Sequence, residues 1–309
     1  MNSFHILVTG ANGQLGSELR RQAAVTPYRW HFTDLPELDI ADSVQVQRLF
    51  ERERYGCCIN CAAYTAVDRA ESEPDIAYRI NAEGPAVLAA ISAHFQASLL
   101  HISTDFVFGG RGNLPISEGV PADPVSVYGK SKAAGESNAL SGNDRVIVLR
   151  TSWLYSTFGN NFFKTILRLG AERDELRVVY DQVGSPTYAR DLAGAILAIV
   201  DRLAEGNRMP EKAFGIYHFS NEGVASWYDF AVEIASLAGL RAEVVPIRTA
   251  DYPLPAPRPA YSVLDKQRIR EFLGMRISNW REALHRCYKE YTSPPGSQSG
   301  HKQPGQGER

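Results

Sequence analysis

The sequence predicts an α/β fold with a doubly wound parallel sheet, followed by a smaller C-terminal unit. Three observations support this prediction. Short β-branched or apolar runs alternate with longer helical stretches through the first half of the chain, the pattern of a parallel sheet covered by helices on both faces. Three glycines stand at the first junction between a strand and a helix. After Arg150 the composition changes, and Trp, Tyr, Phe, Asn and Gly cluster.

The first unit is expected to contain five strands separated by helices. The predicted strands cover residues 4–9, 30–33, 57–61, 99–103 and 145–150, and the last of them is expected to complete the sheet. The predicted helices cover residues 13–24, 43–54, 74–95 and 127–141.

The second unit is expected to be built from separate parts of the chain. After a helix that follows residue 163 and the turn-rich DQVGSPTYARD, the amphipathic helix at 191–203 could pack back on the sheet. Another helix is predicted at 226–237, and the Pro-rich YPLPAPRPAY must be a loop. We therefore assign residues 1–150, with about 189–220, to the first unit, and 151–188 with 221–292 to the second. Residues 293–309 are almost free of apolar side chains, which predicts a disordered tail.

Composition excludes several classes of protein. The formal net charge of -2 gives no basic footprint for nucleic acid. No apolar run approaches the roughly 18 residues that a membrane span needs, and the N-terminus lacks the features of a signal peptide. Cys57, Cys58 and Cys61 crowd one predicted strand, with Cys287 far away, so buried thiols are a better interpretation than a metal, redox or disulfide site. We expect a cytoplasmic protein.

Four histidines lie in or near predicted strands and are expected to be structural rather than catalytic: His5, His31, His101 and His218.

The glycine turn TGANGQLGSEL is the first candidate binding site. Gly10, Gly13 and Gly16 permit a tight turn and a close approach of the backbone to a pyrophosphate, and the following helix supplies free N–H groups. Such turns also serve simple packing. Its place at the first βα junction favours dinucleotide binding, which makes the first unit a dinucleotide-binding domain.

Residues after the second and third strands fit the adenosine half of such a cofactor. Asp34 lies 18 residues beyond Gly16, about where a carboxylate accepts the hydrogen bond of a ribose hydroxyl. A helix or turn cap is the alternative for this residue. Asp39 and Ile40 could flank the adenine, and the small side chains of Ala62 and Ala63 allow the cofactor to lie across the backbone.

The candidate catalytic residues are Tyr128 and Lys132 on a helix, with Ser103 and Thr104 at a strand end. Tyr and Lys four residues apart share one helical face. A nearby ammonium stabilises a phenolate, which would make the phenol a competent proton donor near neutral pH. Tyr-x-x-x-Lys alone is common, and its combination with the glycine turn carries the prediction.

Taken together, eight segments resemble the dTDP-4-dehydrorhamnose reductase family of the extended short-chain dehydrogenases, which have a Rossmann-type sheet. The resemblance covers essentially residues 3–292, in VTGANGQLGSEL, NCAAYTAVDRAESEP, HISTDFVFGG, VYGKSKAAGE, RTSWLY, GNNFFKT, DQVGSPTY and RPAYSVLD. It implies a C-terminal domain that binds a sugar nucleotide. The implied reaction moves hydride from NADPH or NADH to C4 of dTDP-4-dehydro-L-rhamnose and gives dTDP-L-rhamnose.

The resemblance also implies roles for individual residues. Gly13, Gln14 and Leu15 would meet the pyrophosphate, and Ala63, Tyr64 and Thr65 would line the cofactor. Tyr128 would donate the proton, with Lys132 as its partner and Thr104 tuning it. The implied sugar and diphosphate ligands are Thr104, Asp105, Trp153, Arg258 and either Asn160 or Asn161, of which we select Asn161. Such an Asn could instead cap a turn, and Arg258 could be a surface residue.

The chain departs from the commonest family pattern at Phe106, where Tyr is usual, and at Gly109, where an acidic residue often stands. One alternative is a nucleotide-sugar epimerase or dehydratase, but a dehydratase needs an acid where Phe106 stands. Another is a non-catalytic regulatory subunit of a methionine adenosyltransferase, which keeps the cofactor fold. Mg²⁺ is associated with some of the family, but no residue pattern here argues for it. The sequence leaves the oligomeric state open, a homodimer included.

Overall fold

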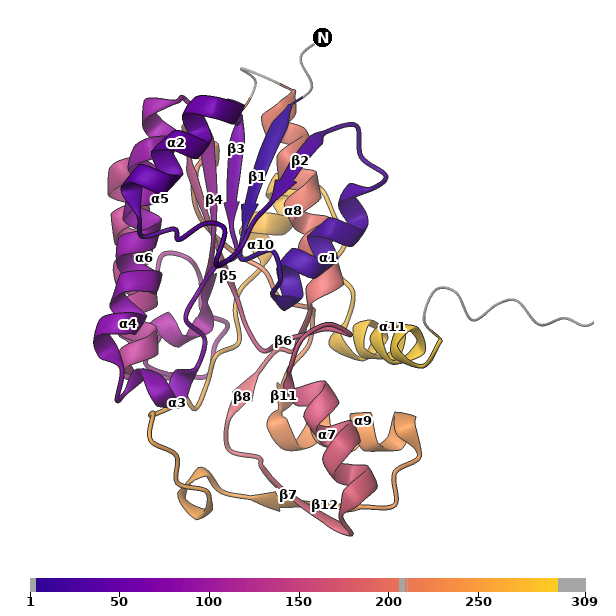
Figure 1. The fold of residues 1–309 in the computed structure, drawn as a ribbon. Helices are drawn as coiled ribbons and strands as arrows, with labels where there is room; N and C mark the ends of the chain where they lie inside the picture. The colour runs from indigo at the N-terminus through magenta and orange to yellow at the C-terminus, as the bar shows by residue number, and fades with distance from the viewer. Residues whose placement is uncertain (1–3, 206–208, 210, 294–309) are drawn as a thin grey trace, which may run out of the picture.

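The computed structural model describes residues 4–205, 209 and 211–293. Its centre is a six-stranded sheet of order β10-β5-β4-β3-β1-β2, in which every neighbouring pair is parallel (Figure 1). The strands are β1 (His5–Thr9), β2 (Arg29–Phe32), β3 (Cys57–Asn60), β4 (Ser98–Thr104), β5 (Val146–Thr151) and β10 (Gly215–His218). From β1 the chain continues to β2 on one side and to β3 on the other. Ligands of open α/β sheets bind at such a switch point, outside the carboxyl ends of the strands.

The expectation that the strand ending near Arg150 completes the sheet is wrong. The sixth strand, β10, follows a long excursion of the chain and pairs with β5 from Gly215↔Ile147 to His218↔Arg150. Its four residues, GIYH, carry too short an alternation to be recognised as a strand. This segment becomes a strand because it pairs with the open edge of β5.

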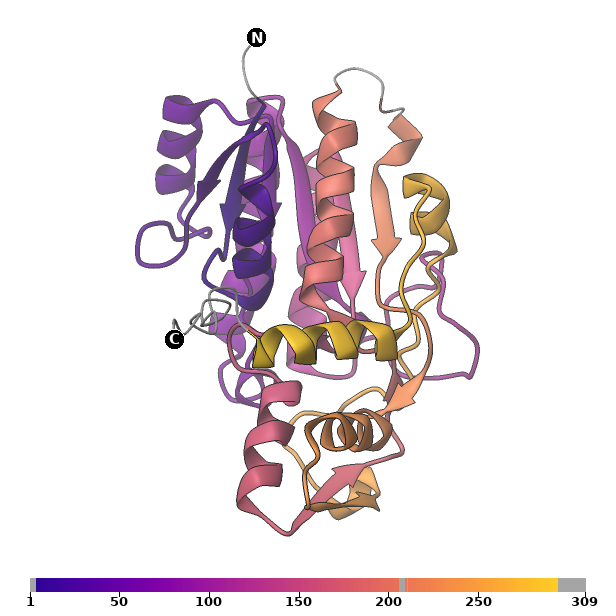
Figure 2. The same cartoon turned by 90° about the vertical axis from the view of Figure 1, so that its right-hand side faces the viewer.

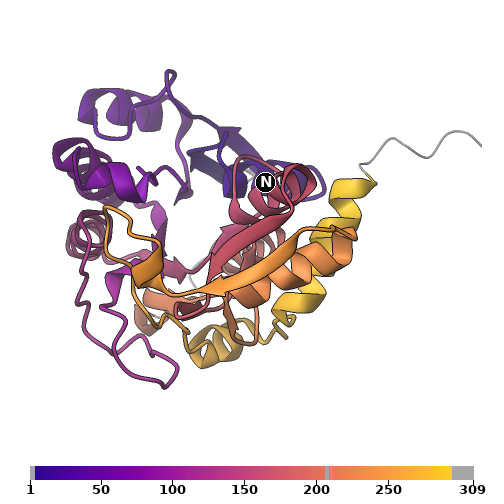
Figure 3. The same ribbon diagram turned by 90° about the horizontal axis from the view of Figure 1, so that it is seen from below.

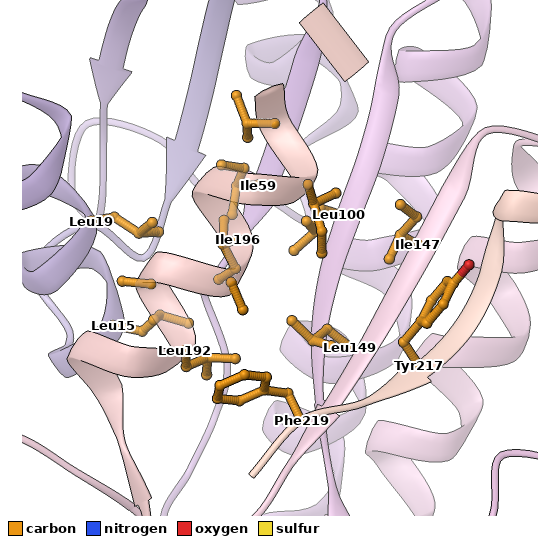
Figure 4. Packing of buried hydrophobic residues seen from close by; sticks show 14 of the residues in the cluster. Leu15, Leu19, Ile59, Leu100, Ile147, Leu149, Leu192, Ile196, Tyr217 and Phe219 are labelled. Carbon is orange, nitrogen blue, oxygen red and sulfur yellow. The ribbon is translucent and has the colours of Figure 1, made fainter. Parts of the chain in front are cut away.

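Helices cover both faces of the sheet (Figures 1 and 2). On one face lie α2 (Ser43–Glu53), α5 (Gly84–His94) and α6 (Val127–Gly142), and on the other α1 (Gln14–Ala23) and α8 (Ala189–Ala204). The predicted return of α8 to the sheet is confirmed, because its apolar face belongs to the same core as α1 and five of the strands. Figure 4 shows this core, with Leu15, Leu19, Leu192 and Ile196 of the helices facing Ile59, Leu100, Ile147, Leu149, Tyr217 and Phe219.

The helix predicted at 74–95 is interrupted. It consists of α4 (Pro74–Tyr78), a π-helical segment η1 (Arg79–Glu83) and α5. The buried Asn81 lies in η1, where its side chain accepts from the Tyr64 N–H and donates to the Tyr64 carbonyl and the Ser131 hydroxyl. These bonds tie the segment to the chain that leaves β3. Such π-bulges often occur at functional sites.

A second, smaller group of elements lies beyond the carboxyl ends of the strands (Figure 3). It contains α7 (Phe162–Glu172), α9 (Trp227–Ala238) and three short strand pairs: β6 (Leu154–Tyr155) with β9 (Thr187–Tyr188), β7 (Glu175–Val179) with β12 (Glu243–Ile247), and β8 (Val183–Gly184) with β11 (Ala225–Ser226). Its own core also takes in α11 (Trp280–Thr292), which crosses beneath α1 and α8 (Figure 2). The exact division of the chain into two domains stays a prediction. Of the predicted tail, residues 294–309 lie outside the described residues.

Candidate active site

A cavity of about 750 Å³ opens at the carboxyl ends of β1, β3, β4 and β5. It brings together residues from the glycine turn, the chain after β2, the end of β4, helix α6 and the second group of elements. The predicted site residues that line it are Gly10, Gly13, Gln14, Leu15, Gly16, Asp34, Asp39, Ile40, Ala62, Ala63, Thr65, Thr104, Asp105, Tyr128, Lys132, Trp153 and Arg258.

The glycine turn leaves no room for side chains. Gly10 has a φ of +65°, and a Cβ on it would lie 2.4 Å from the Ala62 nitrogen. A Cβ on Gly16 would lie 2.5 Å from Ala11 Cα. Gly13 is the N-cap of α1, and no described side chain caps that end of the helix. Its first N–H groups and partial positive charge are therefore available to a phosphate.

The position of Asp34 is compatible with both roles weighed for it. Its Oδ2 accepts from the Asn12 N–H at 2.9 Å and its Oδ1 from the Leu35 N–H at 2.9 Å, so the carboxylate orders the turn. The residue also lines the cavity. Because each carboxylate oxygen has two lone pairs, both can still accept a hydroxyl.

Helix α6 places the proposed catalytic side chains in the cavity wall. Ser126 caps it by accepting from the Gly129 N–H at 3.1 Å, and a Cβ on Gly129 would lie 2.3 Å from the Phe106 carbonyl oxygen. The helix thus packs closely on the end of β4, where Thr104 lies. Tyr128 and Lys132 are only 9% and 2% exposed.

Burial dominates the proton affinities of this pair. It raises the pKa of Tyr128 to about 12, against a lowering hydrogen bond with Thr104, and lowers the pKa of Lys132 to about 8. The sequence predicted that the Lys132 ammonium would bring the pKa of the phenol toward neutrality. The structure differs from this prediction, because Lys132 Nζ donates to the Ile102 carbonyl at 2.7 Å instead. Tyr128 is therefore protonated at neutral pH, the state that a proton donor needs.

Asp105 is buried beside this pair. Burial raises the pKa of its carboxyl to about 6, although hydrogen bonds with Ser262 and Thr104 lower it. Thr104 Oγ1 donates to Asp105 Oδ1 at 3.1 Å and accepts from the Phe106 N–H at 3.2 Å. The end of β4 is thus a rigid polar corner of the cavity.

An aromatic wall lines part of the cavity. It consists of Trp153, Trp227 and Phe162, and the rings of Trp153 and Trp227 stack with centroids 3.6 Å apart and planes 5° apart. Trp153 has a φ of +47°, an unfavourable conformation for a bulky residue. Backbone strain of this kind clusters at functional sites. A Cβ on Gly184 would lie 2.8 Å from Trp153 Nε1, so the indole fits only beside a glycine.

A family model described as the RmlD substrate binding domain matches residues 4–293. The dTDP-4-dehydrorhamnose reductase of Aggregatibacter actinomycetemcomitans is 42% identical over 294 residues, which are 92% of this chain and 99% of the relative. The chain belongs to the dTDP-4-dehydrorhamnose reductase family. This confirms the resemblance drawn from the sequence.

Solved structures of the reductase family have the same fold. That of dTDP-4-dehydrorhamnose reductase from Clostridium acetobutylicum has a TM-score of 0.88 at 41% identity, covering 94% of this chain and 100% of that one. The reductase from Bacillus anthracis, solved in complex with NADP, has a TM-score of 0.86 at 40% identity and covers 93% and 99%. The predicted Rossmann-type α/β class is confirmed.

Two predicted site residues do not line the cavity. The Tyr64 hydroxyl donates to Glu73 at 2.5 Å. Asn161 is the N-cap of α7, where its Oδ1 accepts from the Lys164 N–H and its Nδ2 donates to the Ser156 carbonyl. Asn161 therefore has the capping role that was considered for an Asn in this region. Asn160 lines the cavity instead.

The lining residues that were not identified from the sequence include Arg79, Phe162 and Trp227. Arg79 forms an ion pair with Asp39 and lies in the π-helical segment. Arg258 was identified, and it forms an ion pair with Asp68 across 2.8 Å. The aromatic-rich stretch around Phe162 was a signal in the sequence that could have identified this residue. Trp227 gave none, since it begins an ordinary amphipathic helix.

The predictions for histidine and cysteine can be followed in the structure. His101 and His218 are buried with polar partners, and burial raises the pKa of the Cys57 thiol to about 12. Cys61 is only partly buried and lines the cavity. Among the described residues, no group of three or more His, Cys, Asp or Glu could hold a metal ion. In the same part of the chain, no helix is long and apolar enough to cross a membrane.

Proposed function

We propose that this member of the family reduces the C4 keto group of dTDP-4-dehydro-L-rhamnose with NADPH or NADH and forms dTDP-L-rhamnose. The observation that carries the proposal is the meeting of Thr104, Tyr128 and Lys132 in the cavity that begins at the glycine turn. Family membership names the substrate, because the relatives at about 40% identity are dTDP-4-dehydrorhamnose reductases. We place the reaction in the cytoplasm.

The described residues fit the cofactor. The cradle at Gly10, which a Cβ would fill, and the uncapped N-terminus of α1 suit a pyrophosphate held near Gly13, Gln14 and Leu15. Asp34 and Ile40 line the part of the cavity that suits the adenosine half. When bound, the reduced nicotinamide supplies the hydride.

Tyr128 donates its phenolic proton to the oxygen at C4, and the Lys132 ammonium offsets the charge left on the phenolate. A proton donor of this kind contributes about 10²–10⁴-fold. Thr104 and Asp105 bind the sugar from the end of β4, and Trp153 packs against it. Arg258, held by its ion pair with Asp68, is the candidate hydrogen-bond donor to the diphosphate.

Phe106 lines the cavity at the position where a dehydratase of this fold needs an acid. Its ring lies 5.5 Å from that of Tyr128 and cannot transfer a proton. This observation favours simple reduction over dehydration.

The direct test is to follow the absorbance of NADH or NADPH with freshly generated dTDP-4-keto sugar. Oxidation should occur only when that sugar is present. Cofactor binding without turnover, together with tight association to a methionine adenosyltransferase, would instead support the regulatory-subunit alternative.

A further inference from the structure

His101 is a buried histidine that the proposed reaction does not use. It lies in β4, is fully buried, and has its Nε2 3.5 Å from Lys132 Nζ. Its other ring nitrogen, Nδ1, lies 3.1 Å from the side-chain nitrogen of Asn60. Which nitrogen carries the proton decides how His101 acts on Lys132.

The orientation of the Asn60 amide is fixed by its neighbours. Its Oδ1 lies 3.1 Å from the Ala62 backbone nitrogen and 2.8 Å from the Thr9 hydroxyl. A backbone N–H can only donate, so the atom facing Ala62 must be the amide oxygen. The Asn60 NH₂ therefore faces His101 and donates to its Nδ1.

This contact determines the tautomer of His101. Burial and the neighbouring Lys132 hold the pKa of His101 well below its usual range, so the ring is neutral. A neutral imidazole has one N–H and one bare nitrogen. Because Nδ1 accepts from Asn60, the proton is on Nε2 and points at Lys132 Nζ.

The second buried histidine has the opposite arrangement. The His218 Nδ1 lies 3.1 Å from the Ile116 carbonyl, which can only accept, so this nitrogen carries the proton. Its bare Nε2 then accepts from Arg150 at 3.4 Å. His218 thus offers a lone pair to its cationic neighbour, whereas His101 offers an N–H to its own.

We propose that His101 is a positioning residue for the reduction, whose Nε2–H, oriented by Asn60, disfavours the ammonium form of Lys132 and directs that amine toward the Ile102 carbonyl and the cavity. Two donors that face each other cannot form a hydrogen bond while Lys132 is charged, but the neutral amine can accept from His101. The consequence for activity rests on the proposed function, in which the ammonium form is needed.

Other groups also act on Lys132. The Cys61 thiol faces it from the end of β3, and Glu136 faces it from the next turn of α6; both raise its pKa, against burial. Glu136 is itself paired with Arg150 of β5 across 2.6 Å. From the end of β4, Asp105 acts on Tyr128. Of these titratable groups, His101 is the one in direct polar contact with the Lys132 amine, through its ring nitrogen Nε2.

The tautomers can be measured without any assay of activity. In ¹⁵N NMR spectra of the histidine rings at neutral pH, His101 should be protonated on Nε2 and His218 on Nδ1. The spectra of His101→Gln and His218→Gln assign the two rings. A His101 ring protonated on Nδ1, or on both nitrogens, would overturn the inference even in a fully active enzyme.

The second measurement is the pH profile of kcat/KM. In His101→Gln the amide oxygen can face Lys132, so the pKa of the amine should rise and the basic limb should move to higher pH. The expected change in the apparent acid constant is at least about threefold, a modest shift for a lost neighbouring donor. His218→Gln is the matched control, and its basic limb should stay in place.

The two measurements separate the possible failures. An unmoved limb in a folded His101→Gln protein, checked by its melting temperature, would contradict the role of His101. A wild-type protein without turnover would contradict the proposed function, and the tautomer prediction would still be decided by NMR.

Discussion

Tyr128 and Lys132 lie one helical turn apart, and burial shifts the pKa of each side chain in the direction that favours its neutral form. The phenol's pKa rises to about 12 and the amine's falls to about 8. A phenol that keeps its proton at neutral pH can give it to an alkoxide, which is a much stronger base than phenolate. The loss of activity at high pH should therefore follow Lys132 rather than Tyr128.

Replacing Tyr128 by Phe tests the proton donor. The variant should keep its affinity for the cofactor and lose at least about a hundredfold in kcat, because only the acid is removed. Cofactor titration and steady-state kinetics measure the two quantities. Lys132→Ala should lower both. Near-normal turnover in Tyr128→Phe would show that another group donates the proton.

Replacing Asp34 by Ser tests cofactor preference. The carboxylate should favour the 2′-hydroxyl of NADH over the 2′-phosphate of NADPH by about 1 kcal/mol, under about tenfold, because repulsion in a partly exposed site is screened. Asp34→Ser should weaken the use of NADH and spare that of NADPH. The measurement is kcat/KM for both cofactors. A strong preference of the unaltered enzyme for NADPH would mean that Asp34 does not face the ribose.

At the scale of elements, the turn between β1 and α1 leaves little room for substitution. Its glycines face backbone atoms of the chain leaving β3 and of the turn itself. Backbone atoms cannot move aside as a flexible side chain can. The same close approach brings the cofactor site to the switch point of the sheet.

Gly10→Ala should destabilise the protein by at least about 2 kcal/mol, since it adds both a clash and an unfavourable φ. Cofactor affinity should fall with it. Gly119→Ala is the control, because its Cβ would meet only the Ser117 hydroxyl at 4.0 Å. Thermal melting and cofactor titration compare the two. Equal melting temperatures would show that the turn adapts more readily than its geometry indicates.

At the scale of the whole molecule, the cavity lies between the sheet and the second group of elements. Trp153 follows β5, whereas Trp227 begins α9, yet the two rings stack. The stack therefore couples the sheet to the part of the chain that closes over it. Sugar binding against this wall should depend on both indoles.

Trp227→Ala should raise the KM for the nucleotide sugar about two- to tenfold and leave the KM for the cofactor unchanged, since an aromatic stack is worth about 0.5–1.5 kcal/mol. Tyr228→Ala, on the same helical turn but outside this cavity, is the matched control. If both variants behave alike, the effect belongs to the packing of α9 and not to the substrate.

Most of the fold and much of the site could be predicted because their signals are local. The alternation of strands and helices, the glycine spacing and the four-residue separation of Tyr128 and Lys132 are each contained in a short stretch. The sequence also left open two readings for an Asn near residue 160. Only the position of α7 decided between them, since a helix that begins at Phe162 makes Asn161 its cap.

The sequence by itself determined the α/β class, the family and most of the candidate site residues. Tertiary structure alone decided which distant segments join them: β10 at the edge of β5, Trp227 beside Trp153, and Arg79 on its π-helical segment. It also decided the tautomer of His101, through an amide whose orientation depends on the chain beyond β3. The physical reason is common to all of these. Local patterns set backbone conformation, whereas pairing, stacking and buried hydrogen bonds depend on partners that the fold alone brings within reach.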